Sequence, residues 1–373
     1  RNPYSGRFSG DVIGSLKIIN FLKKKYKVDV VALSNKKSNF KKKIIYFKQS
    51  NYFLKMFYAI CSLLKLEPLQ FGFFLSKKMK DHVEKTAKNY DLLFFYHIRS
   101  SQYLPKNYYG KTIIEMGDLY SSNYFQTFCN LSIFNPLKYI YLLESLLVKR
   151  VEKKIFLFFN RIILFSIYEK KSINKEFRKK IININVSMNS IQKKYTYSLN
   201  NYKILFVGNL SYLPNLLAVK DFIKNSFFLI KKKFPNIKFY VVGNIGKLDK
   251  FFLSFKKGVV ILGQKNNIEK YLKNSICGLA NLRVATGIQG KVLTYMSYGL
   301  PVICSKRVSS NFKNNVMAYE NNNDLIKKII NLKNNKKLSN NLSKKSLKFI
   351  KKFSDNKVGR EYLKIVQFNK KRS

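Results

Sequence analysis

The chain has 373 residues, of which 46% are hydrophobic, so it is long and apolar enough for two folded domains and is not a disordered chain. Its formal net charge of +53 comes from basic residues spread along the whole sequence. One interpretation of this charge is a polyanionic partner, such as nucleic acid or an acidic membrane surface. The other is that it reflects only a biased amino-acid composition. We expect no nucleic-acid partner, because the sequence shows no zinc-finger spacing, helix-turn-helix signature or aromatic recognition motif.

The first half of the sequence alternates between helical and strand patterns. A helix is expected to run to Leu22 from a stretch that contains Gly6 and Gly10. Short apolar runs at residues 28–33, 91–96, 112–116 and 161–166 are typical of buried parallel strands, and residues 139–154 have the period of a helix. Residues 51–80 mix aromatic residues with lysine, which suits either a helix on a membrane surface or core helices with lysines on their rim.

Residues 192–202 are polar and lack apolar periodicity, so we interpret them as an interdomain linker. A second series follows, with strands expected at 203–207, 237–242, 259–262, 276–281 and 300–304. Helices are expected at 214–232, at 268–273 and after Gly287, and two more lie between residue 324 and residue 351. Such alternation of strand and helix predicts a parallel sheet covered on both faces.

The stretch from Thr286 to Ser305 (TGIQGKVLTYMSYGLPVICS) carries the clearest chemical signal. We expect Thr286, Gly287, Ile288 and Gln289 to form a helix N-terminus whose free N–H groups and dipole favour an anion. Gly287 has no Cβ to obstruct a ligand. Lys291 adds a cation one turn later. The alternative is an ordinary helix start in an α/β sheet.

This stretch resembles the donor-binding segment of retaining GT-B glycosyltransferases, and is closest to the sugar transferases of exopolysaccharide and lipopolysaccharide systems. Residues 204–215 (ILFVGNLSYLPN) resemble the first strand and loop of that family's C-terminal domain. The resemblance implies an α/β protein of GT-B architecture, with two Rossmann-like, doubly wound parallel-sheet domains and a cleft between them. It implies an acceptor-side domain at 1–195, whose usual first strand we expect to be missing. A nucleotide-sugar-binding domain at 203–352 and a C-terminal helix at 353–373, which crosses back to the N-terminal domain, would follow.

The resemblance also implies a set of donor-binding residues. Gly208 and Asn209 would lie near the diphosphate, Gln264 beside the nucleotide base, and Arg283 at a strand end where it could bind phosphate. Further members of the set are Gly6, Gly10, Thr286, Gly287, Ile288, Gln289, Lys291 and Thr294. For each, a structural role is the alternative: a tight turn for Gly208 and solvated cations for Arg283 and Lys291.

Two positions depart from the family pattern. The family usually has a glutamate where this chain has Thr294, and often another where it has Thr286. A threonine hydroxyl cannot supply the bidentate anionic acceptor that a carboxylate offers to the ribose hydroxyls. The departure implies that the protein binds the donor more weakly, that it binds the ribose through other groups, or that it has lost activity.

On the acceptor side, Asp118 and His97 are the candidate catalytic residues, and each follows a predicted strand. For Asp118 the resemblance implies this role, since the related enzymes place a histidine or aspartate near this point, facing the transferred sugar. A carboxylate at Asp118 could orient an acceptor hydroxyl or stabilise positive charge at the anomeric carbon. The alternatives are an N-cap role for Asp118 and a structural role for His97.

We therefore predict a hexosyltransferase that moves a sugar from a nucleotide-diphosphate donor to a lipid-linked or oligosaccharide acceptor with retention, in cell-surface polysaccharide biosynthesis. It would need neither a cofactor nor a catalytic metal. The four cysteines, Cys61, Cys129, Cys277 and Cys304, have no paired spacing, so we expect buried thiols in a reducing compartment. We therefore expect a cytoplasmic protein, peripheral to the inner face of an anionic membrane. A degenerate, inactive GT-B binding protein and a nucleic-acid-binding protein are the alternatives.

Overall fold

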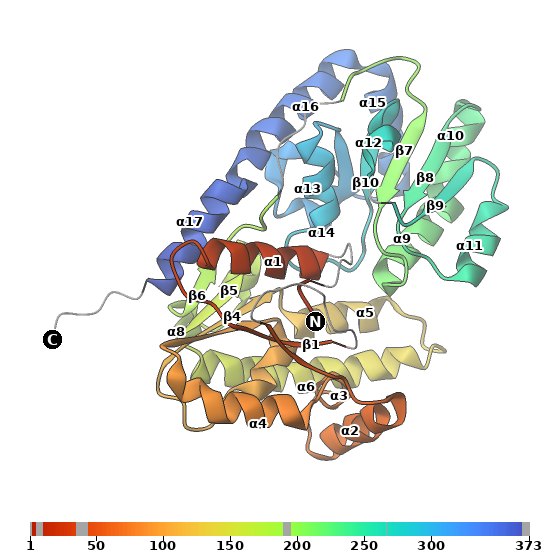
Figure 1. Ribbon diagram of the computed structural model, residues 1–373. Coiled ribbons are helices and arrows are strands. Elements are labelled where there is room, and N and C mark those ends of the chain that lie inside the picture. The colour runs from red at the N-terminus through yellow and green to blue at the C-terminus, as the bar shows by residue number, and fades with distance from the viewer. Residues whose placement is uncertain (1, 5–9, 35–43, 189–194, 266, 368–373) are drawn as a thin grey trace. The chain divides into compact units, whose positions relative to one another are not determined.

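The computed structural model describes residues 2–4, 10–34, 44–188, 195–265 and 267–367 (Figure 1). The chain forms two compact units, one made of Arg1–Ser187 with Asp355–Ser373 and the other of Met188–Ser354. Each unit is built on a parallel β-sheet with helices, so the predicted α/β class with two parallel-sheet domains is confirmed. We call the two parts unit 1 and unit 2.

Unit 2 contains a six-stranded sheet in which every neighbouring pair of strands is parallel. Its strands are β7 (Lys203–Val207), β8 (Lys238–Val242), β9 (Val259–Gly263), β10 (Ser275–Ala280), β11 (Val302–Ser305) and β12 (Met317–Tyr319). The spatial order β12-β11-β10-β7-β8-β9 is that of a doubly wound dinucleotide-binding sheet. Because the chain winds first to one side of β7 and then to the other, the topological switch point lies between β7 and β10.

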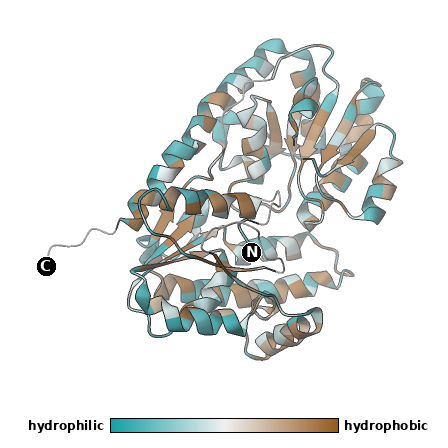
Figure 2. Cartoon of the chain, viewed as in Figure 1, coloured by the Kyte–Doolittle hydropathy of each residue, from teal (hydrophilic) through white to brown (hydrophobic). Residues whose placement is uncertain are grey.

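Helices connect these strands in sequence, as parallel pairing requires. The connecting helices are α9 (Leu213–Phe222), α10 (Phe228–Lys233), α11 (Lys247–Ser254), α12 (Glu269–Leu272), α13 (Gly290–Ser297) and α14 (Lys306–Ser309). Two further helices, α15 (Asn322–Asn334) and α16 (Lys336–Ile350), follow the last strand. A π-helical turn at Ile223–Phe227 joins α9 to α10, so the predicted helix at 214–232 forms with an internal irregularity. Hydrophobic residues predominate along the sheet strands, whereas polar residues mark the outer faces of helices such as α16 (Figure 2).

A tyrosine of α13 bridges the two strands at the switch point. The hydroxyl of Tyr295 accepts a hydrogen bond from Val207 N at 2.6 Å and donates to Leu279 O at 3.3 Å. Its ring is completely buried and lies over Gly278, where a Cβ would come within 2.3 Å of the ring. Gly278 thus makes room for a side chain that links the end of β7 to β10.

Replacing Tyr295 by phenylalanine is expected to destabilise unit 2. The change keeps the ring but leaves the N–H of half-buried Val207 without its acceptor, and such a loss costs up to about 1–3 kcal/mol. A thermal unfolding scan should show a midpoint lower by several degrees. Tyr109→Phe is the matched control, because Tyr109 is 95% exposed and the change should leave the midpoint unaltered. Equal midpoints for Tyr295→Phe and the wild type would contradict the bridging role.

Unit 1 contains a four-stranded parallel sheet in the order β3-β4-β5-β6 and a separate parallel pair, β1-β2. The strands are β1 (Val30–Leu33), β2 (Ile44–Phe47), β3 (Leu92–Tyr96), β4 (Lys111–Gly117), β5 (Arg161–Leu164) and β6 (Ile181–Asn183). The helices are α1 (Gly10–Leu22), α2 (Tyr52–Leu64), α3 (Leu69–Phe73), α4 (Lys77–Thr86), α5 (Tyr120–Asn130), α6 (Leu137–Phe158), α7 (Ile167–Ser172), α8 (Lys175–Arg178) and α17 (Asp355–Val366). Short helical turns at Ala87–Asn89 (η1) and Ile98–Tyr103 (η2) flank β3.

The four-stranded sheet buries side chains on both faces. Ile114 and Ile162 face a core completed by α6, whereas Ile113 and Ile163 face a core completed by α1 and α17. This alternation follows from the period of two along a strand. The C-terminal helix α17 thus packs against α1 in unit 1, where the hydroxyl of its Tyr362 donates to the buried carboxylate of Glu115.

Glutamate side chains hold the N-terminal turn of α5. Oε1 of Glu152, on α6, accepts from Ser121 N at 3.1 Å, and Oε1 of Glu169, on α7, accepts from Leu119 N at 3.0 Å. Burial raises the pKa of Glu152 to about 7. Burial likewise raises the pKa of Glu115 to about 7. Both carboxyls therefore hold a proton in the folded state at pH values where an unfolded glutamate, with a pKa of about 4.3, has lost it.

We expect the stability of unit 1 to fall as the pH rises from about 4 through 7. In that window the folded state binds more protons than the unfolded state, and stability then decreases with pH. The mutation Glu152→Gln removes one of these protons, so its unfolding midpoint should depend less steeply on pH. Glu84→Gln, at an exposed position of α4, is the control and should follow the wild type. A Glu152→Gln curve parallel to that of the wild type would contradict this account.

The cysteines are less uniform than predicted. Cys277 and Cys304 are buried in the unit 2 sheet and Cys61 is half-buried, but Cys129 is exposed on α5, so the prediction is wrong for Cys129. That position lies at the end of the helix, away from the core residue Thr127. Among the described residues, no helix is both long and apolar enough to span a bilayer.

Candidate functional site

The carboxyl ends of β7 and β8 form a tightly packed pair of glycine turns. Gly208 follows β7, and its N–H donates to Val242 O at 2.9 Å. A Cβ on Gly243 would lie 1.8 Å from Gly208 O, so the two backbones approach too closely for any side chain there. Asn209 is exposed beside this turn, and its side chain accepts from Ser211 N at 3.0 Å. A doubly wound sheet binds its ligands at this edge, at the switch point.

Lys291 reaches the same turn from α13. Its Nζ lies 2.6 Å from Oδ1 of Asn215 and 3.9 Å from the centroid of the Phe206 ring. A Cβ on Gly208 would lie 3.2 Å from this Nζ, so Gly208 leaves the ammonium its space. Burial lowers the pKa of Lys291 to about 7. The structure therefore brings Gly208 and Asn215 next to the amino group of Lys291 at the switch point.

The helix in the predicted anion site begins later than expected. α13 starts at Gly290, with Gln289 as its N-cap, so the prediction that residues 286–289 form its first turn is wrong. The physical reason is Gly287, whose φ of 60° is incompatible with a right-handed helix. The carbonyl of Gly287 instead accepts from Nδ2 of Asn311 at 2.7 Å, which fixes the loop. Ile288 lies half-buried in the same loop.

The two threonines of the predicted site differ in their surroundings. Thr286 is 6% exposed, and its carbonyl accepts from Nε2 of Gln289 at 2.9 Å. Thr294 lies half-buried one turn into α13, where its hydroxyl donates to Gly290 O at 3.0 Å. Such a bond to the preceding turn occupies the hydroxyl proton but leaves the oxygen able to accept.

Two further predicted donor residues, Arg283 and Gln264, lie at other positions of unit 2. Nη2 of Arg283 forms an ion pair with Oδ1 of Asp221 on α9 at 2.7 Å, and its side chain is 65% exposed. A phosphate would have to compete with that carboxylate for the guanidinium. Gln264 is exposed directly after β9, two strands away from β7 in the sheet.

In unit 1, Asp118 directly follows β4. Oδ1 of Asp118 is buried without a hydrogen-bond partner among the described residues. The N-cap residue of α5 is Leu119, so the alternative role of Asp118 as an N-cap is wrong. Burial raises the pKa of Asp118 to about 7. Asp118 as a whole is half-buried, and a carboxyl with a buried oxygen that has no hydrogen bond is a candidate for a group that meets a ligand.

His97 follows the neighbouring strand β3, and its backbone is in an unusual conformation with φ 66°. Its Nδ1 lies 2.8 Å from the hydroxyl of Tyr120. Burial, and then the nearby charge of Asp118, raises the pKa of Tyr120, so the phenol keeps its proton and can donate it to Nδ1. In the tautomer that accepts this bond, the ring proton lies on Nε2. β3 and β4 are paired in register, so His97 and Asp118 lie at the same edge of the sheet.

The remaining predicted residues belong to the N-terminal loop. Gly10 is exposed and is the first residue of α1. Gly6 lies outside the described residues. Sequence reasoning missed Asn215 and Tyr120. Tyr120 comes two residues after Asp118, so its position just after a strand could have identified it as a site residue. Asn215 is 76 residues from Lys291, and no local sequence pattern connects the two.

Residues 201–335 match the family model described as "Glycosyl transferases group 1". This range lies within unit 2 and holds β7, the glycine turn and α13. No curated protein sequence matches the chain significantly.

Solved structures of glycosyltransferases share the fold. TarM from S. aureus matches with 16% identity and a TM-score of 0.58 over 78% of this chain, and the chain spans 57% of the length of TarM. HepE from Anabaena, in complex with UDP and glucose, matches with 12% identity and a TM-score of 0.64 over 97% of both chains. A structure of trehalose-6-phosphate synthase matches with 10% identity and a TM-score of 0.67, over 97% of this chain and 98% of that one. The fold is thus that of the GT-B glycosyltransferases.

Proposed function

We propose that the protein is a glycosyltransferase that moves a sugar from a nucleotide-diphosphate donor to a lipid-linked or oligosaccharide acceptor, with retention, in cell-surface polysaccharide biosynthesis. The observation that carries the proposal is the group of Gly208, Asn215 and Lys291 at the switch point of a doubly wound sheet. The family match of residues 201–335 supports it, because this range contains the whole group. UDP is the first nucleotide to test, because solved structures of TarM and HepE hold it.

In this proposal unit 2 binds the donor. The N–H groups of residues 287–290 and the ammonium of Lys291 hold the diphosphate, with Asn209 beside it. These groups stabilise the negative charge that develops on the leaving diphosphate, so we propose that no catalytic metal is needed. Thr286 and Thr294 lie near the ribose and Gln264 lies toward the base, while Arg283 contributes only if a phosphate displaces Asp221.

Unit 1 takes the acceptor in this proposal. The carboxylate of Asp118 orients the attacking hydroxyl or stabilises positive charge at the anomeric carbon. Nε2–H of His97, oriented by Tyr120, donates a hydrogen bond to a sugar hydroxyl. We place the enzyme in the cytoplasm, peripheral to the inner face of the membrane.

A degenerate binding protein is the second candidate. It is favoured by the threonine at position 294, whose hydroxyl already donates within α13 and carries no charge for the ribose. Both candidates bind a nucleotide, but only the enzyme releases free UDP from a UDP-sugar. Measuring that release separates them.

A thermal-shift panel with UDP, GDP, ADP and TDP tests the proposal. A ligand that binds only the folded state raises the unfolding midpoint, by an amount that grows with the ratio of its concentration to its Kd. We expect one of the four to raise the midpoint by several degrees at millimolar concentration. No shift with any of them would contradict a functional donor site.

A further inference from the structure

Helix α2 has its large apolar side chains on the outside. Phe53 is 85% exposed, Leu64 80% and Tyr52 67%, and four more large hydrophobic residues of the helix are at least 43% exposed. The buried residues of α2 are the small ones, Ala59 and Ser62. An ordinary surface helix turns its apolar stripe toward the core. The reversed arrangement leaves most of this apolar face exposed, although the Tyr52 ring makes an edge contact with Phe73.

The packing of α2 on α3 explains why the inner face is small. A Cβ on Gly72 would lie 1.9 Å from the carbonyl oxygen of Tyr58 and 2.6 Å from Oγ of Ser62. The two helices therefore touch backbone to backbone, and no large side chain of α2 fits between them. The exposed face is fixed by this contact rather than by local disorder of the helix.

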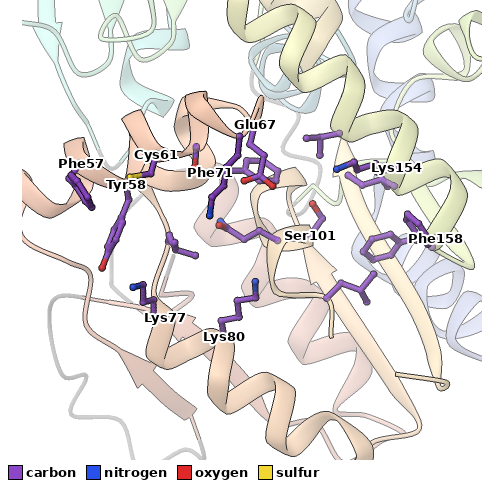
Figure 3. A pocket seen from close by; sticks show the side chains of 18 residues that line it. Phe57, Tyr58, Cys61, Glu67, Phe71, Lys77, Lys80, Ser101, Lys154 and Phe158 are labelled. Carbon is purple, nitrogen blue, oxygen red and sulfur yellow. The ribbon is translucent and has the colours of Figure 1, made fainter. Parts of the chain in front are cut away.

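A cavity of about 500 Å³ opens beside α2, bounded also by α4, η2 and α6 (Figure 3). Buried Phe71 and Phe159 contribute apolar surface to it, and Phe57 of the exposed face lines it as well. Four exposed lysines also line the cavity, namely Lys65, Lys77, Lys80 and Lys154. None of them forms an ion pair within the described part of the chain, and Glu67 is the one acidic residue of the lining.

We propose that α2 and this cavity form a docking surface for an anionic membrane, in which the apolar face enters the bilayer surface and the cavity takes the phosphate headgroup of one lipid. Apolar and aromatic residues flanked by lysines are the composition of helices that lie in a membrane interface. Unpaired lysines around an apolar cavity fit a ligand with a phosphate next to a hydrocarbon chain. Attraction to the negative lipid surface follows from the same charges.

This surface is distinct from the proposed donor site, because every residue named for it belongs to unit 1. The inference does not depend on sugar transfer. A chain without transferase activity would still bind vesicles.

A single introduced tryptophan tests the apolar face. The natural sequence contains no Trp, so Phe53→Trp gives one fluorescent reporter on α2 in the full-length chain. We expect its emission to shift to shorter wavelength with vesicles of phosphatidylcholine and phosphatidylglycerol, and to shift little with phosphatidylcholine alone. Tyr109→Trp, at a 95% exposed position of unit 1, is the matched control and should not respond. No shift at position 53, or an equal shift at both positions, would overturn the proposal.

A second pair of variants tests the cavity. Lys77→Gln with Lys80→Gln should weaken binding to the anionic vesicles by roughly 30-fold, at about 1 kcal/mol per lysine near the surface. Lys23→Gln with Lys24→Gln removes the same charge from the exposed end of α1 and should change binding little. Equal losses for the two pairs would overturn the role of the cavity. Protection of the Lys77 and Lys80 region from hydrogen exchange by glycerol phosphate without vesicles would assign the cavity to a free phosphate instead.

Light scattering on the same proteins distinguishes a membrane from a second copy of the chain. If the wild type is a dimer that Leu64→Asn converts to a monomer, and neither binds vesicles, the face is an interface between copies and the proposal is wrong. The thermal shift with UDP should be unchanged in all these variants. A wild-type protein that responds to UDP but does not bind the anionic vesicles would therefore contradict this inference alone.

Discussion

The mutation Asp118→Asn is expected to reduce the release of UDP from a UDP-sugar by about 100- to 10,000-fold, the usual contribution of a positioned acid or base. The amide has the shape of the carboxylate but carries no charge, and it cannot accept a proton in its place. Because Asp118 belongs to unit 1 and the proposed donor contacts belong to unit 2, the affinity for UDP should stay the same. Turnover of UDP-glucose and UDP-N-acetylglucosamine, with UDP binding measured in parallel, checks both expectations.

The pH dependence of the same reaction identifies the carboxyl group. Burial raises the pKa of Asp118 to about 7, so the active carboxylate forms as the pH rises through that value. The wild-type rate should therefore increase between pH 6 and 8, and the residual rate of Asp118→Asn should lack this rise. Asp91→Asn, an exposed change at the start of β3, is the control and should retain full activity. Wild-type turnover by the Asp118→Asn protein would remove Asp118 from the mechanism.

The mutation Lys291→Met is expected to weaken UDP binding by about 10- to 100-fold, because a hydrogen bond to a charged group contributes about 1.5–3 kcal/mol. Calorimetric titration measures the change directly. Lys250→Met, at an exposed position of α11, should bind UDP like the wild type. Equal affinities for Lys291→Met and the wild type would show that the diphosphate does not contact this ammonium.

Binding at Lys291 should also take up a proton. Burial lowers the pKa of the free lysine to about 7, and a neighbouring diphosphate favours the charged form and raises it. Above pH 7, nucleotide binding should therefore draw a proton from the buffer, and the observed enthalpy should vary with the ionisation enthalpy of that buffer. Lys291→Arg keeps a permanent charge, so it should bind without this buffer dependence. A wild-type enthalpy independent of the buffer at pH 8.5 would contradict the coupling.

Most strands of the two sheets were predictable because their apolar runs are continuous and bounded by polar residues. The edge strands β6 and β12 were missed, because each has only three residues. The run at 203–207 coincides with β7, and those at 91–96 and 161–166 differ from β3 and β5 by no more than two residues. Covering helices on both faces follow from that composition. A periodicity argument cannot show the π-helical turn at Ile223–Phe227, because one extra residue in a turn barely alters an apolar pattern.

The candidate site was only partly predictable. The sequence pointed to Lys291 and to the glycine turn at Gly208, but not to their common neighbour Asn215, because that contact exists only after the sheet has formed. The error at α13 has a local cause, since a glycine before a helix can start the first turn or, as Gly287 does with φ 60°, stand outside it. The ion pair of Arg283 with Asp221 likewise depends on the packing of α9 against the end of β10.

Hydrogen–deuterium exchange with and without UDP tests the central claim most directly, because it locates the ligand on the chain. Amides of the loop before α13 and of its first turn have few partners in the helix, so a bound diphosphate should slow their exchange. The account predicts protection in peptides covering residues 285–293 and the turn after β7. Protection absent from both, or found only around the lysines of α4, would contradict a diphosphate site at the switch point of unit 2.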